Sequence, residues 1–541
     1  MSKTIIFNDK ARKALKSGVD KASNAVKATL GPRGRNVALD KGYGSPIITN
    51  DGVSIAKEIT FKDKFENMGA EIVKEVASST NDIAGDGTTT SVVLLQAIVE
   101  EGMKHTEMGL SAMGVRAGIE KASEDALVAL KSIAKKIETD EEIKQVATIS
   151  AESEELGTII SETIKKIGKD GVVTVEESQS LGIESSVVDG MAFDRGYISS
   201  YMVTNQERME ASYKNVSILV TDKKITSIQE ILPVLEKISQ SGKKELIIIA
   251  DDVDGDALTT LVLNKLRGAF HTLAIKAPGF GDRKKEILKD IAAIVGADVI
   301  SADNGGTFET TTLEMIGSAD KVISDKDSTT IVGGQGSKKL IEDRIVQIRA
   351  QIKISDSKFD KEKLEERLAK LSGGVAVIKV GAATETEMKY LKLKIEDAVN
   401  ATKAAIEEGI VAGGGVALTK VSQKLSDAHV KNKDKMSSDM RVGYEVLIKA
   451  LEQPLRQIAL NAGVDAGVVV DKVRTAKGNV GYDAVKNEIV TDIMVSGIVD
   501  PVKVTRTALE RSVSAAAILL TVEVAIAEDP KEEKDIKTEE Y

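Results

Sequence analysis

The chain has no cysteine, no tryptophan and only three histidines among its 541 residues. Without cysteine it has no disulfide bonds and no thiolate nucleophile, and a Cys/His zinc site is excluded. The histidines are His105, His271 and His429. They are scattered, so each is more typical of a structural or surface position than of a catalytic triad. Aromatic residues make up only 3% of the chain, so Val, Ile, Leu and Ala must fill the cores.

Long apolar runs and an excess of positive charge are also missing. The first residues lack the apolar core of a signal peptide. The most apolar stretch, residues 515–522, meets Glu523 too soon to span a bilayer. We therefore expect a cytoplasmic protein with no membrane partner. The formal net charge of −10 argues against a nucleic-acid partner, because general binders of the phosphate backbone carry a basic face.

The length predicts about three or four domains, and the hydrophobic pattern changes along the chain. Helical periodicity dominates both ends, whereas strands and helices alternate in the middle. The expected strands of the middle part are 246–250, 272–277 and 298–301, and its expected helices are 258–266, 283–295 and a charged pair over 338–371. A short β interruption is expected at 36–40 and 47–49. The pattern indicates a helical domain built from both termini, with an inserted α/β domain that has a parallel sheet.

The strongest local signal is the run Gly85-Asp86-Gly87-Thr88-Thr89-Thr90, which is followed at once by an apolar helical pattern. Glycines allow close backbone approach, and a helix N-terminus favours an anion. Asp86 is an oxygen ligand of the kind that Mg²⁺ prefers. The run therefore predicts either a phosphate cradle or an ordinary capped helix start. The residue types alone leave both interpretations open.

Several other motifs have sufficient structural explanations. Residues 29–34 end an amphipathic helix at a Gly-Pro break, and Asn50-Asp51-Gly52 is typical of a hairpin turn. Asp397 lies on an expected helix, where an acid usually faces solvent. Asp500-Pro501 is typical of a helix N-cap followed by proline. Gly413-Gly414-Gly415 interrupts an apolar run and indicates a close backbone approach.

Together these motifs match one family in the same order along residues 3–525. The sequence resembles the group I chaperonins, the GroEL type. The motifs that carry the resemblance are 30–37 (LGPRGRNV), 50–53 (NDGV), 85–90 (GDGTTT), 193–197 (FDRGY), 276–281 (KAPGFG), 373–384 (GGVAVIKVGAAT) and 407–418 (EEGIVAGGGVAL).

The resemblance implies a multidomain fold that is mainly helical with α/β parts. A helical equatorial domain is expected at 1–133 and 408–526, an intermediate hinge domain at 134–189 and 375–407, and an α/β apical domain at 190–374. Residues 527–541 are acidic, lack the Gly-Gly-Met repeats frequent in the family, and are predicted to be a disordered tail.

The resemblance also implies a site for ATP, Mg²⁺ and K⁺. The expected binding residues are Thr29, Leu30, Gly31, Pro32, Asn50, Asp86 (the Mg²⁺ ligand), Gly87, Thr88, Thr89, Thr90, Gly414, Asp483, Ala484, Val485 and Asp500. Asp51 and Asp397 are expected to orient and activate the attacking water. A swing of the intermediate domain would bring Asp397 over the nucleotide. Asn50 stands where a lysine is common, but a K⁺ ligand supplied by its backbone carbonyl would survive that change.

Apolar positions on the expected helices 229–238 and 257–266, and in a third patch at residues 197–202, match a surface that binds unfolded client proteins and a GroES-type lid co-chaperonin. The positions are Tyr197, Ile198, Tyr201, Met202, Leu232, Leu235, Leu258, Val262 and Leu263, with Met202 where an aromatic residue is common. The alternative is that half of them belong to the core. Exposed apolar patches usually mean recognition, and their attraction is non-directional.

The resemblance implies a homo-oligomer of two stacked heptameric rings, fourteen subunits in all, in which ATP hydrolysis times the folding cycle. Arg456 and Asp465 match positions at the contact between rings. Two rival interpretations remain: a small-molecule phosphohydrolase or kinase that uses Asp51, Asp86 and Asp397, and an adhesive assembly with a vestigial ATP site.

Overall fold

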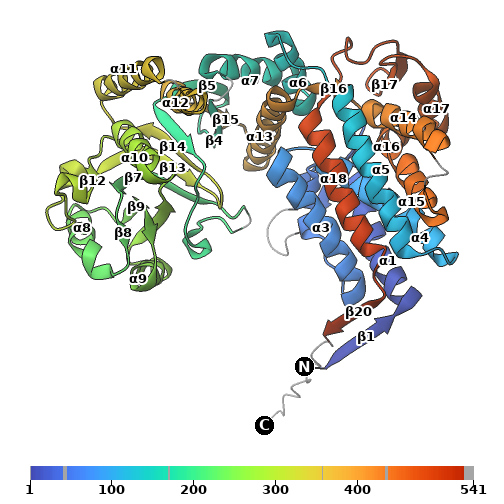
Figure 1. Cartoon of the computed structure of the whole chain (residues 1–541), viewed down its shortest axis with the longest axis horizontal. Coiled ribbons are helices and arrows are strands. Elements are labelled where there is room, and N and C mark those ends of the chain that lie inside the picture. Colours follow the sequence, from blue (N-terminus) through green and yellow to red (C-terminus); the bar gives the residue numbers. More distant parts are fainter. Residues whose placement is uncertain are drawn as a thin grey trace. The chain divides into compact units, whose positions relative to one another are not determined.

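The computed structural model describes residues 2–40, 46–168, 171–206, 208–355, 357–432 and 436–528 (Figure 1). The chain divides into two compact units. Unit 1 is Met1–Ser161 together with Ala383–Tyr541, and unit 2 is Glu162–Ala382. A helical part from both ends of the chain and an inserted α/β part were both predicted. The division assigns the expected hinge segments partly to unit 1 and partly to unit 2, so the three-domain boundaries stay a prediction.

Unit 1 consists mainly of helices. They are α1 (Asn8–Lys27), α2 (Gly52–Glu58), α3 (Lys64–Ala84), α4 (Thr88–Glu107), α5 (Ala112–Ser132), α6 (Asp140–Ala151), α13 (Glu385–Glu408), α14 (Val416–Asn432), α15 (Ser438–Ala450), α16 (Gln453–Asn461), α17 (Ala466–Thr475) and α18 (Val502–Leu519). Helix α7 (Glu154–Ile167) contains the boundary with unit 2. Every helix of the described residues is too short or too polar to cross a membrane.

The core of unit 1 forms where α3, α4, α5, α15 and α18 lie side by side (Figure 1). Helix α4 is buried on most sides, with Leu94, Leu95 and Ile98 fully enclosed, as expected for a helix that is apolar around much of its circumference. Helices α1 and α3 approach closely at Gly69, where a Cβ atom would lie 2.1 Å from the carbonyl oxygen of Leu15. Tight helix packing therefore replaces large aromatic side chains in this core.

Four small antiparallel ladders complete unit 1. They pair β1 (Lys3–Phe7) with β20 (Val524–Glu528), β2 (Val37–Leu39) with β3 (Ile47–Thr49), β16 (Ile410–Ala412) with β19 (Val499–Pro501), and β17 (Gly481–Asp483) with β18 (Glu488–Val490). The pair β2 and β3 confirms the predicted β interruption. Ala527 and Glu528 belong to β20, opposite Thr4 and Lys3, so a tail starting at 527 is wrong by two residues. The rest of that predicted tail lies outside the described residues.

Unit 2 is built around a seven-stranded sheet. Its strand order is β11-β9-β7-β13-β14-β6, with β12 beside β7. The strands are β6 (Gly190–Phe193), β7 (Ala211–Thr221), β9 (Glu245–Ala250), β11 (His271–Lys276), β12 (Val299–Ile300), β13 (Gly317–Ser324) and β14 (Thr329–Gly334). Strands β7, β9, β11 and β12 run parallel, as predicted for the βαβ units.

The other strands of this sheet are antiparallel, so the expectation of a purely parallel sheet is wrong. One of these three pairings follows from a tight turn between β13 and β14. The Oδ1 atom of Asp325 accepts hydrogen bonds from the backbone N–H groups of Asp327 and Ser328, both at 2.7 Å. A connection this short can join only antiparallel neighbours.

The remaining elements of unit 2 cover this sheet or extend it. The helices are α8 (Ile228–Gln240), α9 (Gly255–Leu266), α10 (Gly281–Val295), α11 (Lys338–Ile354) and α12 (Lys358–Ser372), with short helices η1 (Ser200–Met202), η2 (Ala302–Asn304) and η3 (Leu313–Met315). Strands β4 (Val172–Glu177), β15 (Val375–Gly381) and β5 (Gly182–Val188) form a second sheet, and β8 (Lys224–Ile225) pairs with β10 (Asp252–Val253). The predicted charged pair of helices is confirmed as α11 and α12.

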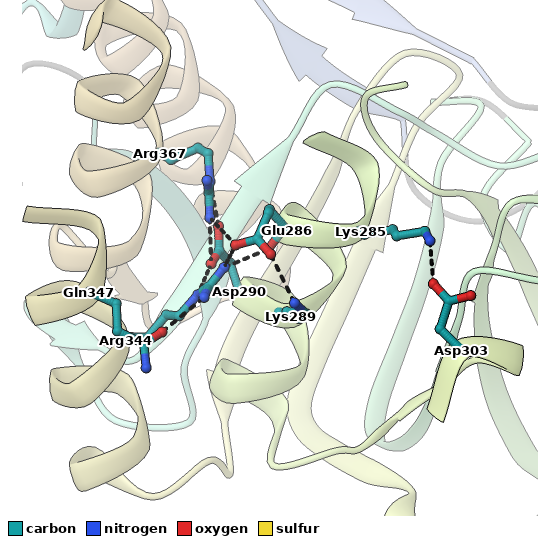
Figure 2. Close-up of polar contacts among 8 residues, drawn as sticks. All are labelled: Lys285, Glu286, Lys289, Asp290, Asp303, Arg344, Gln347 and Arg367. Atoms are coloured by element: carbon teal, nitrogen blue, oxygen red, sulfur yellow. Dashed lines mark hydrogen bonds and ion pairs between the residues drawn. The ribbon is translucent and has the colours of Figure 1, made fainter. Parts of the chain in front are cut away.

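One buried carboxylate attaches this charged pair to the rest of unit 2 (Figure 2). Asp290 on α10 is fully buried and forms ion pairs with Arg344 of α11 at 2.6 Å and Arg367 of α12 at 2.8 Å. Glu286, one turn earlier, also pairs with Arg344. Burial alone would raise the pKa of Glu286, but hydrogen bonds from Lys289 and Arg344 outweigh it and lower the pKa to about 2. The helices α11 and α12 are therefore held by charge as well as by apolar contact.

We predict that Asp290→Ala lowers the free energy of unfolding of unit 2 by up to about 3–5 kcal/mol, because Arg344 and Arg367 lose their buried partner and keep only the half-buried Glu286. Scanning calorimetry measures the effect. Asp303→Asn is the control, since its pair with Lys285 is exposed (Figure 2) and exposed pairs contribute little. Equal unfolding temperatures for the two variants would contradict the role given to Asp290.

Candidate functional site

A pocket of about 180 Å³ in unit 1 brings together most of the predicted nucleotide residues. The predicted residues that line it are Thr29, Leu30, Gly31, Asn50, Asp51, Asp86, Gly87, Thr88, Thr89, Thr90 and Asp397. Its other lining residues are Thr49, Gly52, Asn81, Gly85, Ser150, Glu152, Tyr390, Leu393 and Lys394. Segments from both halves of unit 1 thus meet at one concave surface.

The first turn of α4 forms one wall of this pocket. Gly85 ends α3 with φ 70° and Gly87 precedes α4 with φ 82°, both in the left-handed region that favours glycine. No side chain caps the first turn of α4. Its N–H groups are therefore available to an anion, which the helix dipole also favours. The run is thus a helix start whose cap residue is glycine, and it is compatible with a phosphate site as well.

The same two glycines let neighbouring helices approach the pocket. A Cβ atom on Gly85 would lie 2.2 Å from Cβ of Asn400 on α13. A Cβ atom on Gly87 would lie 2.5 Å from Cγ1 of Val504 on α18. Both distances are far below van der Waals contact, so any larger residue would push α13 or α18 away. The glycines of the run are thus required for packing as well as for backbone conformation.

Asp86 is half-buried at the edge of this turn. Its Oδ1 accepts the backbone N–H of Gly87 at 2.5 Å, and its Oδ2 accepts the hydroxyl of Ser150 at 3.2 Å. Burial raises the pKa of Asp86, and the charges of Asp51 and Glu152 raise it further, against the effect of these two hydrogen bonds. A carboxylate in such surroundings is stabilised by a cation.

Asp500 lies close enough to Asp86 for their charges to interact. Burial raises the pKa of Asp500 to about 7, and the charge of Asp86 adds to this rise, while hydrogen bonds from the backbone N–H groups of Gly414 and Gly415 oppose it. Sequence analysis expected Asp500 to cap a helix. In the structure it belongs to β19, opposite Val411, and α18 begins only at Val502. The cap prediction is therefore wrong, because pairing with β16 holds this residue in extended backbone.

The donor set suits a magnesium ion that also has substrate ligands. Within the described parts of the chain, no group of three or more His, Cys, Asp or Glu residues is placed to hold a metal alone. Mg²⁺ typically takes one or two protein carboxylates and completes its shell with waters and phosphate oxygens. Asp86 beside the open first turn of α4 provides that combination.

Asp51 begins a helix rather than a hairpin. Its carboxylate accepts the backbone N–H groups of Val53 at 3.2 Å and Ser54 at 2.9 Å, so it is the N-cap of α2. The hairpin prediction for residues 50–52 is therefore wrong, because aspartate satisfies the free donors of a helix start equally well. A Cβ atom on Gly52 would lie 2.7 Å from the hydroxyls of Thr88 and Thr89, so α2 begins directly against the first turn of α4.

Helix α13 contributes one face to the pocket. Asp397 lines it together with Tyr390, Leu393 and Lys394, which are spaced at one and two turns along the helix. The Nζ atom of Lys394 is 2.7 Å from Oε2 of Glu152 and 3.1 Å from the hydroxyl of Tyr390. Asp397 is thus half-buried and faces the pocket. Its neighbours in the pocket were not predicted, although spacing from Asp397 could have indicated those on α13.

Several predicted residues lie outside the lining of the pocket: Pro32, Gly414, Asp483, Ala484, Val485 and Asp500. The turn between β17 and β18 holds Ala484 and Val485, and Asp483 ends β17 just before it. Arg33 joins this turn to the pocket wall, donating from Nε to the carbonyl of Ala484 at 3.2 Å and from a terminal nitrogen to that of Val485 at 2.9 Å. The carboxylate of Asp483 accepts the N–H groups of Val485 and Lys486, so it stabilises the turn itself.

The predicted client surface lies on unit 2, where α8 and α9 contact each other. Tyr201 is 68% exposed and Leu263 is 44% exposed. Six other positions are partly buried: Tyr197, Ile198, Leu232, Leu235, Leu258 and Val262. Met202 is fully buried, and its Sδ atom accepts the N–H of Ala274 at 3.2 Å. The prediction that Met202 lies on the exposed client surface is therefore wrong, because its side chain packs into the core of unit 2.

Asp500 makes stability depend on pH. Its folded-state pKa lies above the ordinary 3.8, so its contribution is present below pH 4 and is lost as the pH rises through about 7. We predict that Asp500→Asn flattens this decline in the ligand-free protein and stabilises it at pH 8 by on the order of 2–4 kcal/mol. Urea unfolding at several pH values measures this, with Asp471→Asn, an exposed acid, as control. An unchanged slope would refute the assignment.

Comparison with known proteins agrees with this architecture. Residues 22–530 match the TCP-1/cpn60 chaperonin family. The fold is similar to the crystal structure of the chaperonin gp146 from the bacteriophage EL 2 (Pseudomonas aeruginosa), determined in the presence of ATP-BeFx, with a TM-score of 0.70 and 21% identity over 97% of this chain and 99% of that chain. The resemblance to chaperonins is therefore confirmed at the level of the family. The chain belongs to the TCP-1/cpn60 chaperonins, ATP-dependent proteins that form rings and assist the folding of other proteins.

Proposed function

We propose that this chaperonin is of group I, the GroEL type, and that it encloses non-native polypeptides under a GroES-type lid in the cytoplasm. Two stacked heptameric rings, fourteen subunits in all, would form the chamber. The observation that carries the ATP-driven part is a single pocket that combines the open first turn of α4 with Asp51, Asp86 and Asp397. A helix start without a cap and three nearby carboxylates suit a Mg²⁺-bound triphosphate better than a structural turn.

The pocket residues divide the work of hydrolysis. The N–H groups and hydroxyls of residues 88–90 hold the phosphates, and Asp86 would hold Mg²⁺, which neutralises phosphate charge when bound. The backbone carbonyl of Asn50 would hold K⁺. Asp51 is fixed by its hydrogen bonds to α2, and Asp397 by its place on a long helix. They orient the attacking water between them, which is most of what phosphoryl transfer requires of a protein.

The other end of the nucleotide extends toward the turn between β17 and β18. Pro32, Gly414 and Asp500 would border the sugar, and Asp483, Ala484 and Val485 the adenine. Arg33 supports this placement, because its hydrogen bonds join the two segments that would hold the two ends of the ligand.

The three-domain division remains part of the proposal. Residues 1–133 and 408–526 would form the equatorial domain, 134–189 and 375–407 the hinge, and 190–374 the apical domain. Asp397 already lines the pocket, so a movement of the hinge would govern how long it stays there. Hydrolysis is then conditional on conformation, as in enzymes gated by a lid.

The client surface consists of the exposed Tyr201 and Leu263 with the partly buried Tyr197, Ile198, Leu232, Leu235, Leu258 and Val262. Side chains of this kind offer apolar area without directional contacts, which suits a binder of many unfolded sequences. The lid would bind the same surface and displace the client into the chamber.

Asp397→Asn should retain ATP binding but lower the turnover rate by about 10²–10⁴-fold, because an amide cannot take a proton from water. Steady-state ATPase assays and nucleotide titration separate the two effects. Glu385→Gln is the matched control, since its exposed side chain lies on the first turn of the same helix. Normal turnover in Asp397→Asn would rule out the role.

Replacing Leu263 with Ser should reduce the capture of an unfolded client several-fold and leave ATP turnover unchanged, because exposed apolar area is lost while every lining residue of the pocket is kept. Light scattering of an aggregating client, with and without the chaperonin, measures capture. Leu340→Ser is the matched control: this leucine of α11 is 56% exposed on the same unit. If both variants capture the client equally well, Leu263 is not part of the client surface.

A further inference from the structure

The turn that follows α1 links the pocket to the turn between β17 and β18. Thr29, Leu30 and Gly31 line the pocket, and Arg33 contacts the second turn. The hydroxyls of Thr29 and Thr89 are 3.5 Å apart, so the start of this segment lies beside the first turn of α4. Residues 28–33 therefore touch both places at which the proposed function puts the nucleotide.

Asn461, the last residue of α16, fixes the first half of this turn. Its Nδ2 atom donates to the carbonyl of Lys27 at 3.0 Å and to that of Leu30 at 2.8 Å. Its Oδ1 accepts from the amide of Gln457 at 2.8 Å, so every polar atom of the Asn461 amide has a partner. Gly31 has φ 81°, and a Cβ atom there would lie 3.1 Å from Ile458, so the turn rests directly on α16.

Arg33 fixes the second half. Two nitrogens of its guanidinium group donate to the consecutive carbonyls of Ala484 and Val485. A planar fork of donors is what distinguishes arginine from lysine, whose single ammonium group cannot reproduce the pair of directions. The turn that receives these bonds is already stiffened by Asp483. Arg33 therefore sets the distance between two rigid segments.

We propose that residues 28–33 act as a bridge that fixes the spacing between the phosphate end and the base end of the nucleotide site. Asn461 is the positioning residue for the phosphate end and Arg33 is the positioning residue for the base end. The inference rests on the proposed ATP site. It adds that two side chains outside the pocket lining determine how well ATP fits the pocket.

The test is steady-state ATP hydrolysis by the assembled full-length protein. Arg33→Ala should raise the half-saturating ATP concentration about 3–10-fold, the range expected for lost charge-assisted hydrogen bonds that are partly exposed, and keep kcat within about twofold. Arg33→Lys keeps the charge without the fork and should behave like Arg33→Ala. Asn461→Asp cannot donate to Lys27 and Leu30, so it should also lower kcat, by about tenfold or more.

Arg35→Ala is the matched control, because it removes the same charge two residues further on and should change neither parameter. A half-saturating concentration equal for Arg33→Ala and Arg35→Ala would overturn the proposal, and so would a fall in kcat alone for Arg33→Ala. Thermal melting of each variant separates these effects from lost stability. A wild-type protein without ATP turnover would overturn the proposed function itself.

Discussion

The close approach of helices to the backbone at Gly85 and Gly87 is the constraint on which the site depends. Neither residue has room for a Cβ atom, because α13 and α18 occupy that space. The same backbone must adopt left-handed conformations to end α3 and begin α4. One short run thus constrains where four helices lie. It also leaves the first turn of α4 open, since glycine has no side chain with which to cap it.

Electrostatics adds a second constraint. Asp51, Asp86 and Asp500 come from three distant segments, and burial and mutual repulsion raise the pKa of the latter two. The positive end of α4 offsets part of this cost. A bound cation or a bound proton therefore lowers the free energy of the pocket. The pocket is least stable when it holds neither. Part of the free energy of ligand binding therefore comes from relieving the repulsion among these carboxylates.

Much of this arrangement could be predicted from local pattern. The run at residues 85–90 identified the centre of the site, and periodicity located the parallel strands β9, β11 and β12 of unit 2 with the helices α9 to α12, but not β7. These features succeed because glycine conformation, helix starts and apolar spacing are decided by residues adjacent in sequence. The family resemblance then supplied distant partners such as Asp397, which no local pattern could connect to Asp86.

The failures occurred where tertiary contacts choose between local alternatives. Asp51 and Asp500 each suit more than one turn or cap, and only pairing with a neighbouring segment decides which one forms. An apolar residue such as Met202 suits both a core and a client-binding surface, so the residue type does not decide between them. Its burial depends on contact with Ala274 of β11. The antiparallel pairing of β13 with β14 depends on a turn at Asp325 that the sequence pattern did not predict. The roles of Arg33 and Asn461 were not predicted, because their hydrogen-bond partners are backbone carbonyls. Every residue has one, so no sequence pattern identifies such a partner.

The order of the units along the chain has a consequence for synthesis. Unit 2 is continuous in sequence, so its core is complete once Ala382 has left the ribosome. Unit 1 must wait for α18 and β20, because its core and the pairing of β1 need residues from both ends of the chain. Its contacts are therefore among the most distant in the molecule, which slows folding. A protein that assists the folding of others thus leaves its own apolar helices α1, α3, α4 and α5 without their partners until α18 has been made.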